Sequence, residues 1–156
     1  MQIQLSQKER MLLEDEKHQE GICIKKYQNY AQQAQDSQLK QLCNKLAGEE
    51  QHHYTIIDEM LQGKQPNLSH GQQPMAQGGQ IQQSSYQGAM NNVGDEVLCS
   101  DLLASEKYVS GTYDTGIFEA ANTVVREALQ HIQKDEQQHG QELFNYMNSH
   151  GLYNVK

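Results

Sequence analysis

Apolar residues recur every three or four positions along most of this chain, which is the spacing of one face of an α-helix. Segments with this pattern cover about residues 6–35, 37–62, 93–118 and 123–149. Ser6 and Glu9 form a capping-box sequence at the start of the first segment, and Asp36 or Ser37 can cap the second. Asn122 stands in the corresponding place before the fourth segment. The pattern therefore predicts four helices.

A region without apolar periodicity separates the second predicted helix from the third. Residues 63–92 are rich in Gln, Gly, Ser and Asn and contain both prolines, Pro66 and Pro74, which is typical of a long connection. A helix of about 26 residues is roughly 39 Å long, and a linker of about 30 residues can span it because extended chain covers up to ~3.3 Å per residue. We therefore predict an all-α fold, a ferritin-like antiparallel four-helix bundle with one long crossover between helices 2 and 3, forming a single domain over residues 1–156.

Glutamates and histidines interrupt the apolar faces of these helices. Steps of three and four residues connect Glu50 and His53 to Leu46 and Ile57 on the second helix, and the other three helices show the same interruption. The carboxylates should therefore lie in the core. The six residues concerned are Glu20, Glu50, His53, Glu106, Glu136 and His139.

The two halves of the chain carry this pattern at the same spacing. In each half a glutamate is followed by a tyrosine and then by a Glu-x-x-His pair, which indicates two helical hairpins related by pseudo-symmetry. The first set is Glu20, Tyr27, Glu50 and His53, and adding 86 to each number gives Glu106, Tyr113, Glu136 and His139.

Carboxylates that meet inside a bundle need compensating positive charge. Burying one bare carboxylate costs several kcal/mol, and neighbouring like charges add to that cost. Two divalent cations balance four glutamates beside two neutral imidazoles. One Glu from each of two helices plus a Glu-x-x-His from each of the others is the ligand set of di-iron and di-manganese bundles. We therefore predict two iron or manganese ions, because this oxygen-rich set suits either metal.

Four neighbouring residues are candidates for supporting the ligands. Glu49 and Asp135 each precede a ligand glutamate and could accept a hydrogen bond from the histidine of the facing helix. Tyr27 and Tyr113 could hydrogen-bond a ligand carboxylate and support catalysis in that way, or they could be ordinary core aromatics.

The other acids and histidines are read as solvent-facing. The acidic run at 14–16 is interpreted as a solvated face, although Glu16 could lie near the site. The remaining histidines have no matched partners and are interpreted as surface residues: His18, His52, His70, His131 and His150.

Composition limits the classes of function. The formal net charge of -8 argues against a nucleic-acid partner and against binding to a membrane surface. No apolar run approaches the length of a membrane span, and the start MQIQLSQKER does not resemble a secretory signal, so we expect synthesis in the cytoplasm. Cys23, Cys43 and Cys99 contain no Cys-x-x-Cys pair and are interpreted as small buried hydrophobes.

Residues 100–153 resemble the spore coat protein F family. The similarity is carried by LLASEK (102–107), TYDTGIFEAAN (112–122), the KDEQQH run and the final LFNYM and HGLY pieces, whereas the first half shares only the Glu-x6-Tyr and Glu-x-x-His patterns. That family is similar to the ferritin-like superfamily that includes rubrerythrin and bacterioferritin. The resemblance implies a ferritin-like bundle and localisation in the coat of bacterial endospores, with other coat proteins as partners. A homodimer is a separate expectation.

Three functions are compatible with these patterns. The first is a coat protein with a di-iron or di-manganese centre that acts on oxygen or peroxide, as an oxidoreductase of the peroxidase, catalase or oxidase kind. The second is a structural or assembly protein of the coat without catalytic activity, and the third is a store or donor of metal. The chain lacks the Cys-x-x-Cys iron module of rubrerythrin, so that enzyme's route of electron entry is absent.

Overall fold

Four helices make up most of the computed structural model, which describes residues 2–70, 94–153 and 155. They are α1 (Gln7–Gln33), α2 (Ser37–Leu61), α3 (Asp95–Glu119) and α4 (Thr123–Ser149). Each boundary lies within two residues of the sequence prediction. Within the described residues there is no β-strand, only an isolated bridge between Gln2 and Lys64. The predicted all-α class is confirmed.

The helix starts follow from local hydrogen bonds to side chains. Ser6 and Glu9 form the reciprocal bonds of a capping box at the start of α1. Asp36 accepts from the Gln38 N–H at the start of α2, and Asn122 accepts from the Val124 N–H at the start of α4. These side chains satisfy donors that have no partner within the helix.

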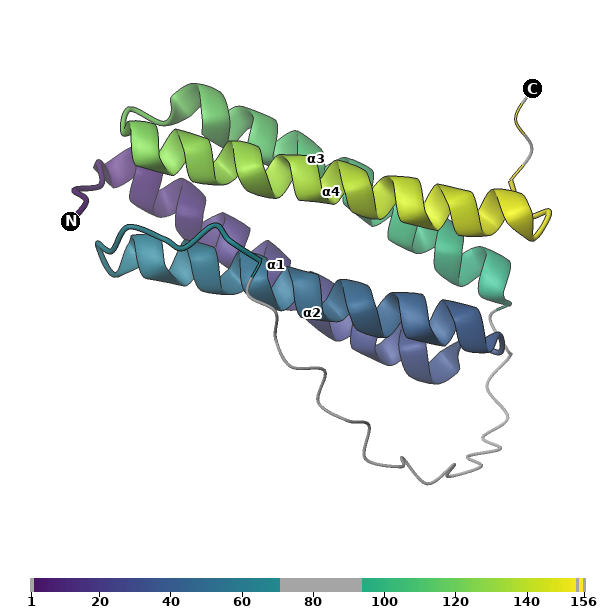
Figure 1. The fold of residues 1–156 in the computed structure, drawn as a ribbon. Coiled ribbons are helices and arrows are strands. Elements are labelled where there is room, and N and C mark those ends of the chain that lie inside the picture. Colours follow the sequence, from purple (N-terminus) through teal and green to yellow (C-terminus); the bar gives the residue numbers. More distant parts are fainter. Residues whose placement is uncertain (1, 71–93, 154, 156) are drawn as a thin grey trace.

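The helices form two antiparallel hairpins that pack face to face. Figure 1 shows α1 beside α2 and α3 beside α4, with short turns joining the members of each pair at opposite ends of the bundle. The chains of α2 and α3 run in the same direction, so the connection between them must return along the whole bundle. Residues 71–92 of the predicted crossover lie outside the described residues.

The apolar core is divided into two clusters, one toward each end of the bundle. One contains Leu13, Ile57 and Ile132, and the other contains Leu39, Leu46 and Leu143. All three cysteines are buried and unbridged, as the sequence predicted. Between the clusters lies a layer of buried polar side chains.

The first residues after α2 pack back against it. Gly63 has a φ of +77°, the left-handed conformation that glycine adopts without strain, and its carbonyl accepts from the Ile3 N–H at 2.8 Å. The segment 64–70 then runs along the outside of α2 (Figure 1), with Pro66 buried and Leu68 against the core. This part of the predicted linker is non-helical, as expected, but it is attached to the bundle.

No helix in the described part of the chain is both long enough and apolar enough to cross a membrane.

Candidate metal centre

The polar layer contains the six residues that the sequence singled out. Each hairpin contributes three of them, one from its first helix and a Glu-x-x-His pair from its second. The side chains come close because they continue the apolar face of each helix at the same height in the bundle. Their exposed fractions are 0% for Glu20, Glu50, His53 and His139, 1% for Glu136 and 4% for Glu106.

These side chains form two overlapping groups of potential metal ligands. The first consists of Glu20, Glu50, His53 and Glu136, and within it one ligand atom from each residue lies within 4.8 Å of the others. The second consists of Glu50, Glu106, Glu136 and His139, whose ligand atoms also lie within 4.8 Å of one another. Glu50 and Glu136 therefore belong to both groups, and each group has its own histidine and its own outer glutamate.

The two histidines direct the same nitrogen toward the carboxylates. His53 Nδ1 lies 3.1 Å from Glu50 Oε2 and 3.1 Å from Glu136 Oε1. His139 Nδ1 lies 3.3 Å from Glu50 Oε1 and 3.5 Å from Glu106 Oε1. The imidazole rings are stacked, with centroids 5.5 Å apart. Nδ1 is thus the nitrogen that either group would offer to a cation.

The opposite nitrogen of each ring contacts an acid on the facing helix. His53 Nε2 of α2 lies 3.2 Å from Asp135 Oδ2 of α4, and His139 Nε2 of α4 lies 2.6 Å from Glu49 Oε2 of α2. Because an ionised carboxylate only accepts hydrogen bonds, Nε2 can donate its hydrogen to the acid in both rings. This arrangement fixes the ring orientation, and in a neutral imidazole it would leave the Nδ1 lone pair for the interior.

Each of the two tyrosines contacts a glutamate of the other hairpin. The Tyr27 hydroxyl of α1 donates to Glu106 of α3, and the Tyr113 hydroxyl of α3 donates to Glu20 of α1. Both phenols are buried, with 2% and 0% of their surface exposed. Each one orients an outer glutamate, so these residues contact the carboxylates of the layer as well as filling the core.

The cluster contains more acidic than basic side chains, and all of them are buried away from solvent. Burial, reinforced by the charge of Glu50, raises the pKa of Glu20 and of Glu136 well above the usual value. Burial alone would lower the pKa of His139, but the nearby carboxylates of Glu106, Glu49 and Glu50 raise it to about 12. The pKa of His53 rises for the same reason.

Several buried atoms in the layer lack any hydrogen-bond partner. Because orphaned buried polar atoms cost about 1–3 kcal/mol each, a site with several of them fits a group that would satisfy them together. Within the described residues these atoms are Glu20 Oε2, Glu50 Oε1, Glu106 Oε2, Glu136 Oε2 and His139 Nδ1.

One residue of the acidic run is buried, contrary to the interpretation of that run as a solvated face. Glu14 and Asp15 are exposed, whereas Glu16 is only 4% exposed and accepts a hydrogen bond from the Thr112 hydroxyl at 3.1 Å. Burial raises the pKa of Glu16 to about 7. The apolar spacing of α1 was the signal that could have shown this, since Glu16 precedes Glu20 by one turn.

The histidines outside the layer are only partly as expected. His18, His70 and His150 are exposed, but His52 and His131 are half-buried, and both flank His70.

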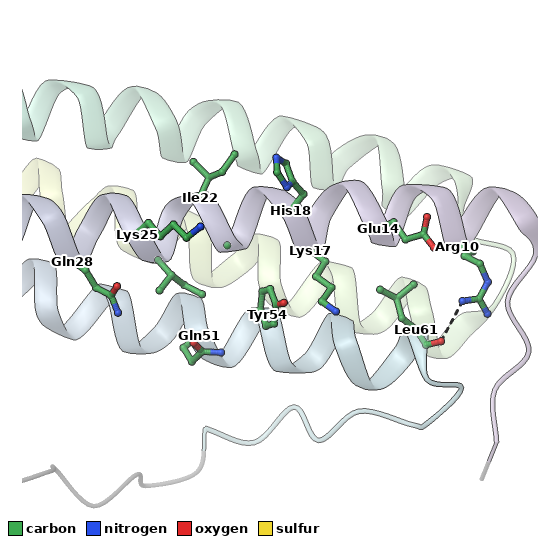
Figure 2. Close-up of a pocket in the computed structure, with 12 residues that line it drawn as sticks. Arg10, Glu14, Lys17, His18, Ile22, Lys25, Gln28, Gln51, Tyr54 and Leu61 are labelled. Atoms are coloured by element: carbon green, nitrogen blue, oxygen red, sulfur yellow. Dashed lines mark hydrogen bonds between the residues drawn. The ribbon is translucent and has the colours of Figure 1, made fainter.

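A surface pocket lies away from this layer. It runs along the outer side of α1 and α2, and Figure 2 shows Lys17, Lys25 and Tyr54 among the side chains that line it. None of the six clustered residues lines this pocket, so it gives no direct access to them.

Comparison with known families gives a match in the C-terminal part of the chain. Residues 94–156 match the model of the Coat F domain, which confirms the resemblance predicted from residues 100–153. No curated protein and no solved structure matched the chain. The relation to the ferritin-like superfamily stays a prediction that rests on the residue pattern and the helix arrangement.

Proposed function

We propose that this chain, whose residues 94–156 are a Coat F domain, is a spore coat protein that binds two iron or manganese ions between its four helices. The observation that carries the proposal is the pair of buried ligand groups that share Glu50 and Glu136. Each of these two carboxylates has two oxygens, so it could offer one to either ion of a dinuclear centre with this ligand set.

Charge supports the same conclusion. Six carboxylates lie in or beside the layer: the four ligand glutamates, Glu49 and Asp135. The imidazoles could supply at most two positive charges, and two divalent ions would supply four. Cations would also use the orphaned carboxylate oxygens and the free Nδ1 of His139. The two imidazoles would then be neutral, each with its Nε2–H held by an acid across the bundle.

The donor set favours particular metals. Each group offers one imidazole nitrogen and three carboxylates, and neither group contains a cysteine. Hard oxygen donors with one nitrogen suit iron(II) or manganese(II). When bound, such a pair of ions would supply two-electron redox chemistry toward oxygen or peroxide.

The residues around the layer have definite tasks in this proposal. Asp135 and Glu49 hold the histidine rings in one orientation, and Tyr27 and Tyr113 hold the outer glutamates. The phenols also place an O–H proton at the edge of the site. The two apolar clusters above and below exclude bulk water from the layer.

The proposal is tested by metal analysis of protein produced with ample iron and manganese. About two ions per chain are expected, and less than about half an ion per chain would contradict a metal-based role. The activity is tested separately by the conversion of two H2O2 to two H2O and one O2, a reaction that needs no external electron donor.

A structural role is the alternative if metal is present without activity. Apolar clusters toward both ends stabilise the bundle. In this alternative, the ions at its middle would neutralise the buried carboxylates and have no catalytic role. Metal-loaded protein that consumes no peroxide, alone or with an added reductant, would favour this alternative over the redox function. Release of loaded iron to a chelator with no loss of fold would instead favour a metal store.

The proposed location is the spore coat, with other coat proteins as partners and neither nucleic acid nor membrane among them. A homodimer remains a further expectation, which light scattering of the purified chain would test.

A further inference from the structure

Three histidine rings lie side by side on the outside of the bundle, and two of them face one carboxylate. His70 Nε2 lies 3.4 Å from Asp135 Oδ2, and His131 Nε2 lies 3.5 Å from the same oxygen. The His70 ring stands between the other two, with its centroid 5.3 Å from that of His52 and 5.4 Å from that of His131. From this geometry we propose a second cation site, separate from the central layer and formed by His70, His131 and Asp135, with His52 at its edge.

Three different segments bring these side chains together. His52 lies on α2, His131 and Asp135 lie one turn apart on α4, and His70 ends the segment that follows α2. That segment reaches this position because Gly63 reverses the chain and residues 64–70 run back along α2 (Figure 1). The Asn67 N–H donates to Glu59 at 3.2 Å, which fastens the segment three residues before His70.

The donors fit a divalent cation. One ligand atom from each of His70, His131 and Asp135 lies within 4.8 Å of the others. His52 Nε2 and His131 Nε2 are buried atoms without a hydrogen-bond partner in the described structure, so nothing else there uses them. Two imidazoles and a carboxylate form a donor set suited to zinc or a similar borderline ion, and solvent can reach the group because the His70 side chain is 53% exposed.

Asp135 connects this outer site to the central layer. The same Oδ2 atom that faces His70 and His131 lies 3.2 Å from His53 Nε2. A cation on Asp135 would therefore draw electron density from the carboxylate that orients His53. This coupling rests on the proposed function, whereas the outer site itself does not, because none of its three ligands belongs to the six central residues.

The test counts zinc bound to the full chain after equilibrium dialysis at low micromolar free Zn²⁺. Wild type is compared with His70→Ala, His131→Ala and the matched control His18→Ala, an exposed histidine of α1. Loss of a supporting partner alone costs about 10–100-fold in metal affinity, so loss of a direct ligand should weaken outer binding by at least about tenfold. Both cluster variants should bind about one zinc fewer than wild type, and His18→Ala should bind as many as wild type.

Zinc that enters the central layer is included in all four counts, so the test uses the difference between each cluster variant and His18→Ala. His70 is exposed and lies outside the helices, so its replacement leaves the bundle intact and keeps the test decisive if His131→Ala fails to fold. Equal zinc content in wild type and His70→Ala would overturn the outer site. A Glu20→Gln variant that loses central metal but keeps the outer zinc would show that the two sites stand separately.

Discussion

Glu136 belongs to both groups of potential ligands, whereas Glu20 belongs to only one. We therefore expect that replacing each of them by glutamine removes different amounts of bound metal. Glutamine keeps the size of the side chain but removes its charge and makes it a poor metal ligand. Glu136→Gln should therefore remove most of both ions, whereas Glu20→Gln should remove about one. The matched control is Glu127→Gln, an exposed glutamate on the same helix as Glu136.

The magnitude follows from binding linkage. An ion present at 100 times its dissociation constant stabilises the folded state by about 2.7 kcal/mol, so two ions contribute roughly 5 kcal/mol. A domain of this size shifts its melting temperature by about 2–4 °C per kcal/mol. The metal-loaded wild type should thus melt roughly 10–20 °C above the metal-free protein. Glu20→Gln should keep about half of that difference and Glu136→Gln almost none.

The assay is differential scanning calorimetry with and without chelator, with metal counted on the same samples. Subtracting the metal-free melting temperature of each variant removes the effect that the substitution has on the bare fold. Equal losses of metal and of stabilisation in Glu20→Gln and Glu136→Gln would refute the assignment of Glu136 as a shared ligand.

Two further predictions concern buried acids outside the layer. The folded-state pKa of Glu16, about 7, is above the usual 4.5, so its contribution to stability is present below pH 4.5 and is lost as pH rises through 7. Glu16→Gln should remove this loss, on the order of 2–3 kcal/mol between about pH 5 and pH 8, as measured by urea unfolding at each pH. Glu9 accepts the N–H groups of Ser6 and Asn122 at 2.8 and 2.7 Å, so Glu9→Ala should lower the free energy of unfolding by about 2–4 kcal/mol.

The control for both variants is Glu14→Gln, an exposed acid on the same helix, which should change stability by less than about 0.5 kcal/mol. A pH dependence in Glu16→Gln as steep as in wild type would contradict the account of Glu16. A Glu9→Ala variant as stable as Glu14→Gln would contradict the account of Glu9.

The helices and the central polar layer could be predicted because both depend on the spacing of residues along a single helix. Glu50 and His53 continue an apolar face whose other members are buried, so their position in the core follows from helix geometry alone. The equal spacing in the two halves predicted that the two sets of three residues would lie at the same height in the bundle. The contact between Asp135 and His53 was also predicted from the sequence. Asp135 directly precedes Glu136 on one helix, and His53 lies on the helix that faces it.

The outer cluster was not predictable in this way. His70 lies in a segment without periodicity, and its place beside His52 depends on the reversal at Gly63 and on Pro66 packing against the bundle. The hydrogen bond that Glu16 accepts from Thr112 likewise joins two hairpins. Contacts of this kind are set by tertiary packing, and no spacing within one helix encodes them.

The most direct test of the central claim is anomalous X-ray scattering from crystals of the full chain grown with iron or manganese. The account predicts two anomalous peaks in the middle of the bundle, with Glu50 and Glu136 each adjacent to both. Well-ordered crystals with no peak there, and with the glutamates hydrogen-bonded only to protein or water, would contradict it.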